Sequence, residues 1–105
     1  MRLVVAIIQP TKLSTVREAL KDKGIDRMTV CDAVGYGRQR GQTSRFRGNE
    51  YKVDLLRKLA IEIVIQDSEV ATVIETIRSV ALTGSRGEIG DGKIFVLPVA
   101  QVIDI

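Results

Sequence analysis

The sequence contains no histidine and no tryptophan, and its 105 residues include one cysteine. Histidine is the commonest general base and the commonest transition-metal ligand in proteins. Its absence excludes serine–histidine and cysteine–histidine catalysis and argues against a zinc site. The single thiol, Cys31, excludes an internal disulfide and fits a reducing cytoplasm. The apolar-rich segment around Cys31 predicts a buried structural thiol.

Long hydrophobic runs are also missing. No apolar segment approaches the roughly 20 residues that a membrane-spanning helix needs. The chain begins with an apolar run, but Pro10 interrupts it and no small-residue cleavage site follows, so we expect a strand and not a signal peptide. We therefore expect a cytoplasmic protein with no direct membrane insertion. The length predicts one domain, 1–105, and the net charge of +3 points to an anionic partner.

Periodic apolar patterns predict the secondary structure. Continuous or alternating apolar runs are typical of strands, and apolar residues three and four apart are typical of helices. Pro98 indicates that the last clear strand is short or lies at an edge. The predicted strands are 3–8, 28–34, 59–65 and 93–97, with 99–105 as a further candidate, and the predicted helices are 12–23 and 67–81.

The ends of the predicted helices carry recognisable residues. Thr11, Ser14 or Thr15 can cap the first helix, and Gly24 can end it. Asp67 or Ser68 can cap the second helix. The order strand, helix, strand, strand, helix, strand predicts an α+β fold of the ferredoxin-like βαββαβ type with an antiparallel sheet.

The sheet of this fold has one face that the two helices do not cover. Residues 3–8 and 59–65 are nevertheless apolar on both strand faces. A domain of this size has no further element to cover the second face. We therefore expect self-association, with a closed ring of three as the favoured form once the resemblance below is considered.

A long segment, 35–58, separates two of the apolar runs, has no helix or strand period and concentrates glycines and basic residues. Loops of this length in small domains are usually functional or disordered. Its start, GYGRQRG, resembles a dinucleotide fingerprint, but the third glycine comes one position late and no helix follows. Two interpretations remain: a solvated hairpin loop, or a nest of backbone N–H groups with Arg38 facing a phosphate.

A second glycine-rich turn covers residues 85–92. Gly87 to Lys93 has the spacing of a P-loop, but Ile94 stands where the magnesium-binding Ser or Thr is required and a strand follows instead of a helix. This is not a Walker A site. A plain helix-to-strand turn is one interpretation, and an anion-binding turn is the other. Two such turns in one small domain favour phosphate binding.

Three further residues have an ordinary and a functional interpretation. Lys58 and Glu62 lie in a predicted strand, where a surface or edge pair is the usual explanation. Tyr51 lies in the long segment. Its ordinary interpretation is a local packing anchor, and its functional interpretation is an accessible phenol that is used for contact or modification.

Several segments together resemble the signature segments of the PII nitrogen-regulatory proteins, over nearly the whole chain. Proteins of that family are homotrimers with a ferredoxin-like fold. They bind ATP or ADP in clefts between subunits and sense 2-oxoglutarate together with Mg-ATP. A long flexible loop docks on targets such as ammonium channels and nitrogen-metabolism enzymes. The matching segments are YGRQRG at 36–41, RGNEY at 47–51, Lys58 with IEI at 61–63, TG at 83–84 and IGDGKIF at 89–95.

The resemblance also implies which residues hold the ligands. Residues 36–57 become the flexible effector loop, with 38–55 facing a membrane transporter or regulatory enzyme. Gln39 would hold magnesium with ATP, and Gln39 with Lys58 would bind 2-oxoglutarate. Tyr51 matches a tyrosine that some bacterial members have uridylylated. The implied nucleotide-binding residues are Thr29, Gly35, Gly37, Arg38, Gln39, Glu62, Val64, Thr83, Gly84, Gly90, Asp91, Gly92 and Lys93.

The sequence differs from the family pattern at three places. The turn after Gly84 is longer by residues 85–88, where Arg86 offers a new contact. Asp104 stands where the family usually has basic residues that reach the nucleotide phosphates, and the loop tip at 43–47 is more basic than usual. These differences suggest a specialised paralogue that senses ADP or AMP and controls a different transporter or enzyme.

Two other function classes fit the sequence less well. An RNA-binding module of the same strand order would stack bases on aromatics of its central strands, and 28–34 and 59–65 contain none. A nucleotide-processing enzyme would need a general base and an intact P-loop, so we expect no enzymatic activity and no catalytic residue.

Overall fold

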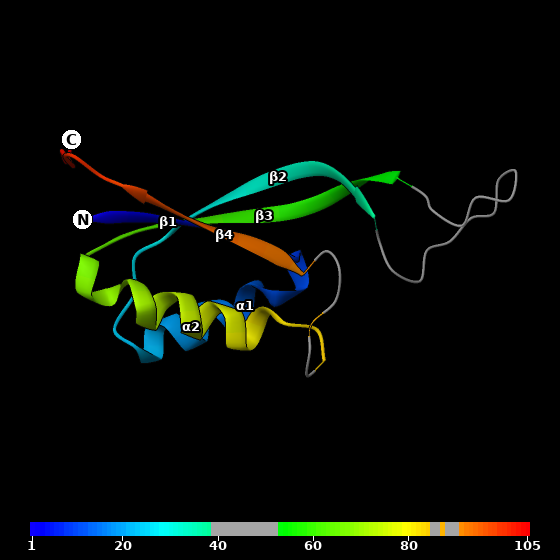
Figure 1. The fold of residues 1–105 in the computed structure, drawn as a ribbon, viewed down its shortest axis with the longest axis horizontal. Coiled ribbons are helices and arrows are strands. Elements are labelled where there is room, and N and C mark those ends of the chain that lie inside the picture. The colour runs from blue at the N-terminus through cyan, green and yellow to red at the C-terminus, as the bar shows by residue number, and fades with distance from the viewer. Residues whose placement is uncertain (39–52, 85–86, 88–90) are drawn as a thin grey trace, which may run out of the picture.

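The computed structural model describes residues 1–38, 53–84, 87 and 91–105, with the backbone alone for 36–38 and 53–55. Four strands form one sheet, and two helices cover one of its faces (Figure 1). The elements are β1 (Arg2–Ile8), the 3₁₀ turn η1 (Pro10–Lys12), α1 (Leu13–Asp22), β2 (Thr29–Arg38), β3 (Val53–Ile65), the 3₁₀ turn η2 (Asp67–Glu69), α2 (Val70–Ala81) and β4 (Gly92–Pro98).

The sheet has the strand order β2-β3-β1-β4, and each neighbouring pair is antiparallel. Both helices connect strands that are separated by one other strand, which is the ferredoxin-like arrangement of two split βαβ units. The α+β fold predicted from the sequence is confirmed. β4 ends at Pro98 and lies at the sheet edge, where a residue without a backbone donor disturbs no ladder.

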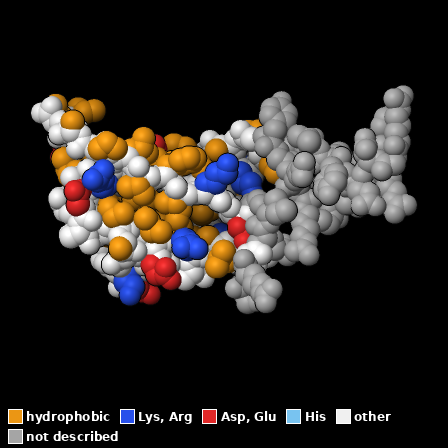
Figure 2. All heavy atoms as spheres, viewed as in Figure 1, with side chains coloured by type: hydrophobic (Ala, Val, Ile, Leu, Met, Phe, Trp, Pro, Cys, Tyr) orange, Lys and Arg blue, Asp and Glu red, His pale blue; other side chains and the backbone are white. Residues whose placement is uncertain are grey.

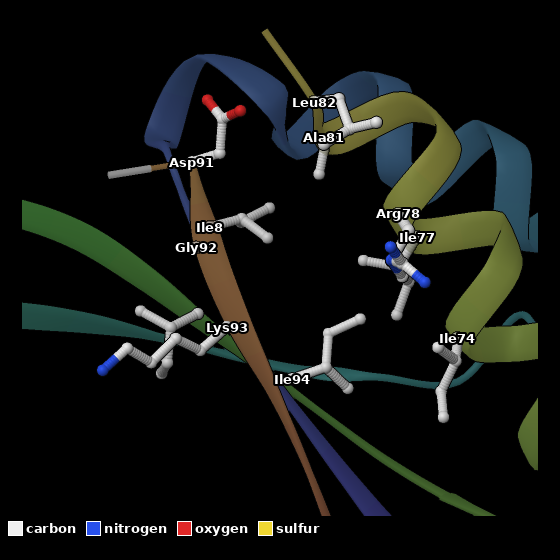
Figure 3. A pocket seen from close by; sticks show the side chains of 11 residues that line it. Ile8, Ile74, Ile77, Arg78, Ala81, Leu82, Asp91, Gly92, Lys93 and Ile94 are labelled. Carbon is white, nitrogen blue, oxygen red and sulfur yellow. The ribbon is translucent and has the colours of Figure 1, made fainter. Parts of the chain in front are cut away.

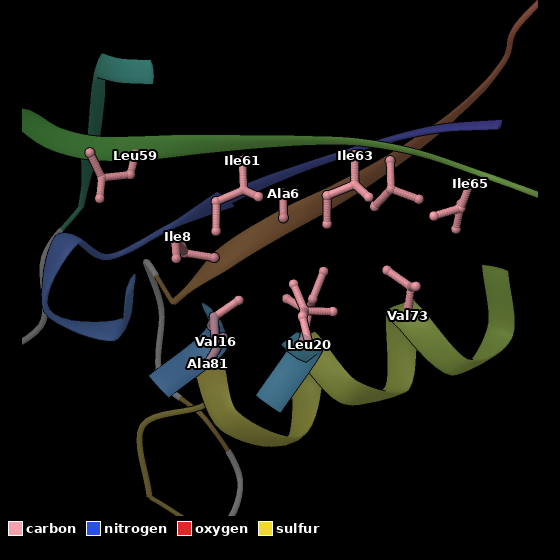
Figure 4. Packing of buried hydrophobic residues seen from close by; sticks show 12 residues of the cluster. Ala6, Ile8, Val16, Leu20, Leu59, Ile61, Ile63, Ile65, Val73 and Ala81 are labelled. Carbon is pink, nitrogen blue, oxygen red and sulfur yellow. The ribbon is translucent and has the colours of Figure 1, made fainter. Parts of the chain in front are cut away.

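The hydrophobic core lies between the sheet and the helices. Alternate residues of β1 and β3 point toward the helices, which present Val16 and Leu20 from α1 and Val73 from α2 (Figure 4). This arrangement follows from the two periods of the sequence, two in strands and 3.6 in helices. The buried hydrophobic residues are Val4, Ala6, Ile8, Val16, Leu20, Leu59, Ile61, Ile63, Ile65, Val73, Ile77 and Ala81.

The helix starts differ from the predicted caps. α1 begins after the 3₁₀ turn η1, its N-cap is Lys12, and no side chain caps it, so the caps expected at Thr11, Ser14 or Thr15 are wrong. Pro10 favours this tight entry because its ring fixes φ near the helical value. Before α2, Gln66 and Glu69 form a reciprocal capping box around η2 in place of the caps expected at Asp67 or Ser68.

Other residues fix the ends of these elements. Gly24 adopts a left-handed φ of 82° and ends α1 as expected, with hydrogen bonds from Gly24 N to Lys21 O and from Ile25 N to Leu20 O. Asp67 contacts the chain-terminal ammonium at 3.2 Å and the Arg2 guanidinium at 3.4 Å, which joins the start of β1 to η2. The ammonium, by hydrogen bond and by charge, lowers the pKa of the Asp67 carboxyl below its ordinary value.

The two middle strands are longer than the apolar pattern indicates. Strand pairing continues from Ala33↔Lys58 through Arg38↔Val53, so β2 ends four residues later and β3 begins six residues earlier than expected. The predicted bounds of the long loop, 36–57, are therefore wrong at both ends. This part of the hairpin projects beyond the helices (Figure 1), so it has no core face that would impose an apolar period.

The face of the sheet that the helices leave open, here called the outer face, is largely apolar. It carries Leu3, Val5 and Ile7 of β1, with Phe95 and Leu97 opposite them on β4. Phe95 is 50% exposed and Leu97 is 43% exposed. Cys31 lies on this face opposite Ala60 and is exposed, so the prediction of a buried thiol is wrong. Residues 99–105 form no strand.

No helix in the described part of the chain is long and apolar enough to cross a membrane.

Candidate functional site

The outer face of the sheet brings together Thr29, Glu62 and Val64, three of the residues expected to bind the nucleotide. Thr29 pairs with Glu62 across β2 and β3, and Glu62 pairs with Val5 of β1. Val64 lies two residues further along β3 on the same face and is 47% exposed. Thr29, Glu62 and Val64 therefore form one accessible group, on a surface where Glu62 is the acidic residue among the described side chains.

Other expected residues lie toward the opposite end of the same face. Lys58 pairs with Ala33, and Gly35 pairs with Leu56, where the β2–β3 hairpin leaves the helices. Gly37 and Arg38 are the next residues of β2 in the pairing. Gln39, Tyr51 and Gly90 lie outside the described residues, as does most of the expected effector loop.

The turn between α2 and β4 is organised by Asp91. The Asp91 carboxylate accepts hydrogen bonds from the Thr83 backbone N–H at 2.9 Å and from the Thr83 hydroxyl at 2.5 Å. It also accepts one from the Gln9 amide Nε2 at 3.2 Å. Thus one carboxylate joins the end of α2, the start of β4 and the end of β1. Gly84, the next residue after Thr83, has φ of 70°, which a glycine adopts without strain.

Gly92 begins β4 in very close contact with β1. Its φ is 145°, and a Cβ built there would lie 1.9 Å from the Ile7 carbonyl oxygen. Only glycine fits such a position. The next residue, Lys93, is exposed and pairs with Ile7, so its ammonium group extends from the outer face while Ile94 turns toward the helices (Figure 3).

Beside this turn lies a groove of about 340 Å³ between α2 and β4. Ile8, Ile77 and Ile94 give it an apolar floor, and Arg78 of α2 reaches its rim (Figure 3). Apolar side chains are also gathered across the middle of the molecular face that shows β4 and α2 (Figure 2). The groove lies on the helix side of β4, and Lys93 and the outer-face residue Ile7 also belong to its lining.

The expected site residues thus form two groups on one chain. The first, called the strand group, is Thr29, Glu62 and Val64. The second, called the turn group, lies around Gly92, whose row in the sheet contains Ile8 and Leu59. From that row to the row of Thr29 and Glu62 is three residues along β3, about 10 Å at 3.4 Å per residue, and to Val64 it is five residues, about 17 Å. Lys58 and Lys93 lie at the turn-group end, which gives this end positive charge suited to phosphate or carboxylate.

The described residues contain no cluster of three or more acidic, cysteine or histidine side chains that could hold a metal ion. The residue expected to contact magnesium, Gln39, is outside that part of the chain.

Sequence reasoning missed two residues near the turn group. Gln9 donates to Asp91, and the Lys12 Nζ lies 3.3 Å from the Leu82 carbonyl oxygen, which it reaches as a donor. The signal for Gln9 is the strand register, because Ile8 pairs with Gly92 and the next residues on each strand are Gln9 and Asp91. The sequence alone does not show that register, because it depends on the pairing of β1 with β4.

These features define a class of protein: a ferredoxin-like α+β domain whose candidate ligand-binding residues are divided between an open sheet face and a clamped glycine-rich turn. The family model described as "Nitrogen regulatory protein P-II" matches residues 1–105. The chain therefore belongs to the nitrogen regulatory protein P-II family.

Relatives support the same assignment. The chain is 53% identical over 105 residues to "Nitrogen regulatory protein P-II 1" of Escherichia coli (strain K12), covering 100% of this chain and 91% of that protein. It is 52% identical to "Nitrogen regulatory protein P-II" of Microchaete diplosiphon and 51% identical to that of Azospirillum brasilense, with the same coverage.

Proposed function

We propose that this protein is a signal transduction protein of nitrogen regulation that binds an adenine nucleotide between the protomers of a homotrimer. Membership of the P-II family and the names of its relatives support the regulatory role. The observation that carries the nucleotide proposal is the separation of the strand group from the turn group on one chain. A neighbouring protomer would bring the strand group of one chain against the turn group of the next.

The outer face supports the assembly. Val64, Phe95 and Leu97 are each 40–50% exposed on a continuous apolar surface. Covering apolar surface stabilises an assembly by roughly 25 cal/mol for each Å² removed from water. A ring of three closes such a contact without leaving free apolar edges.

The turn group supports the phosphate end of the proposed site. Lys93 and Lys58 supply ammonium groups, and Gly92 lets the backbone lie close to β1 without a side chain. The strand group supplies Glu62 and Thr29 as hydrogen-bonding partners for ribose and base, and Val64 as an apolar contact. ATP or ADP fits this division of charge. Magnesium at Gln39 and 2-oxoglutarate at Gln39 and Lys58 belong to the same proposal.

The proposed mechanism is a population shift. Ligands near Arg38, Gln39 and Lys58 would favour some arrangements of the segment 39–52 between β2 and β3 over others, and each effector would change target affinity only by its differential binding to those arrangements. The target would be an ammonium transporter, or another transporter or enzyme of nitrogen assimilation, contacted through 38–55. An RNA-binding function is less well supported, because Phe95 is the one aromatic on the outer face among the described side chains.

Calorimetric titration with ATP, ADP and AMP, with and without magnesium and 2-oxoglutarate, tests ligand binding. Glu62→Gln and Lys93→Gln each remove a charge from one of the two groups, and each variant is expected to bind ATP about tenfold more weakly, as for a lost charged hydrogen bond.

Mixed trimers then test the shared site. Glu62→Gln and Lys93→Gln protomers are refolded together in equal amounts. In a cyclic trimer, about one quarter of the interfaces then place an unaltered Glu62 of one protomer beside an unaltered Lys93 of the next. These interfaces should recover wild-type affinity. Absence of any recovery would mean that both groups act within one protomer, and a monomeric wild type would contradict the proposal altogether.

A further inference from the structure

The Asp91 carboxylate is turned inward, toward protein donors. Its partners are the Thr83 N–H, the Thr83 hydroxyl and the Gln9 amide, at 2.9, 2.5 and 3.2 Å. Thr83 and Asp91 stand at the two ends of the turn, and Gln9 is 82 residues away from Asp91 in the chain. Hydrogen bonds to a charged acceptor are stronger than those between neutral groups. The three residues therefore hold the two ends of the turn together against β1, and we call them the Asp91 clasp.

A described residue inside the turn packs against the clasp. Gly87 has φ of 78°, and a Cβ built there would lie 3.0 Å from Asp91 Oδ2 and 2.8 Å from Leu82 Cδ2. The backbone at Gly87 thus lies over the carboxylate and the Leu82 side chain. Glycine satisfies both the left-handed conformation and the close approach. The clasp and Gly87 are therefore in close contact within the described part of the turn.

Electrostatics gives this arrangement a second consequence. A carboxylate beside a bound phosphate raises the energy of the complex when it faces the anion, since like charges repel. Among the residues of this turn that the structure describes, the inward orientation of Asp91 leaves Lys93, two residues on, as the charged side chain that faces solvent on the outer face.

We propose that Gln9, Thr83 and Asp91 are positioning residues that preset the turn between α2 and β4 for the phosphate groups of the nucleotide. This rests on the proposed function, and it assigns Thr83 and Asp91 a role apart from nucleotide contact. The clasp acts through the turn backbone, so its loss weakens binding in proportion to the phosphate groups of the ligand. The adenine and ribose end, at the strand group, is unaffected.

Thr83→Val tests the clasp with almost no change of shape, since it replaces the hydroxyl with a methyl group. Gln9→Met removes the amide donor at nearly constant length. Thr83→Ser keeps the hydroxyl and serves as the rescue variant, and Thr72→Val on the exposed side of α2 is the matched control. Trimeric wild type and variants are titrated with ATP by calorimetry and with adenosine by NMR. Amide hydrogen exchange is measured across 83–92 without nucleotide.

Thr83→Val and Gln9→Met are expected to weaken ATP binding about tenfold, as for one lost hydrogen bond to a charged group, and adenosine binding less than about twofold. Thr83→Ser and Thr72→Val should match the wild type. Amide exchange across 83–92 should be faster in the two clasp variants.

Unchanged ATP affinity and unchanged exchange in both clasp variants would overturn this inference and leave the proposed function intact. Equal losses for ATP and adenosine would also overturn it, as a general effect on folding. A wild type that binds no adenine nucleotide would overturn the proposed function and the positioning role together.

Discussion

At the scale of single residues, Gly92 shows most clearly how one position constrains the site. It combines a φ of 145° with a Cβ position 1.9 Å from the Ile7 carbonyl oxygen. Gly24 offers a comparison, because its φ is 82° but a Cβ there would meet nothing within 4 Å. Gly92 is required both by its backbone conformation and by its close approach to Ile7, whereas Gly24 is required by its backbone conformation alone.

Alanine substitution should separate these two requirements. Gly24→Ala is expected to lower the free energy of unfolding by about 1–2 kcal/mol, which is the strain of a left-handed L-residue. Gly92→Ala is expected to lower it by about 3 kcal/mol or more, because the strain is joined by a collision between β1 and β4. Urea denaturation at one fixed protein concentration measures both. Equal effects of the two substitutions would show that β4 can move away from Ile7 without loss.

At the scale of elements, the helices keep the sheet in place through a small number of deeply buried side chains. Leu20 of α1 is fully buried among the residues of β1, β3 and α2 that form the core. Its neighbour Lys21 is exposed on the same helix.

Leu20→Ala is expected to lower the free energy of unfolding by about 3 kcal/mol, from lost burial and a residual cavity. Lys21→Ala should change it by less than about 0.5 kcal/mol. Chemical denaturation followed by circular dichroism compares them, and a small effect of Leu20→Ala would mean that α1 adjusts its position to fill the space.

At the scale of the whole molecule, the proposed trimer depends on the open outer face. Phe95 lies on the edge strand β4, in one row of the sheet with Val5, Glu62 and Thr29. Phe95→Lys places a charge where the proposed trimer would exclude water. We expect the mass in solution to fall from three chains to one chain of 11.6 kDa, measured by light scattering.

The matched control for this substitution is Ala71→Lys, which adds the same side chain to an exposed position of α2. It should leave the mass unchanged. If Phe95→Lys remained an assembly of the wild-type size, the outer face would not be the contact between protomers.

The sequence alone was sufficient for the type and the order of the elements. Val16 and Leu20, or Ile61 and Ile63, recur at spacings that belong to a helix and to a strand, and such spacings depend only on near neighbours in the chain. The same local information placed Gly24 at the end of α1. It did not place Lys12 as the helix cap, because the tight turn at Pro10 changes where the helix can begin.

Only the tertiary structure decided the length of the β2–β3 hairpin, the exposure of Cys31 and the inward orientation of Asp91. Each depends on a partner distant in the sequence: Val53 for Arg38, Ala60 for Cys31 and Gln9 for Asp91. The physical reason is that strand register and long-range hydrogen bonds are set when the elements pack together, and no local period of the sequence records them.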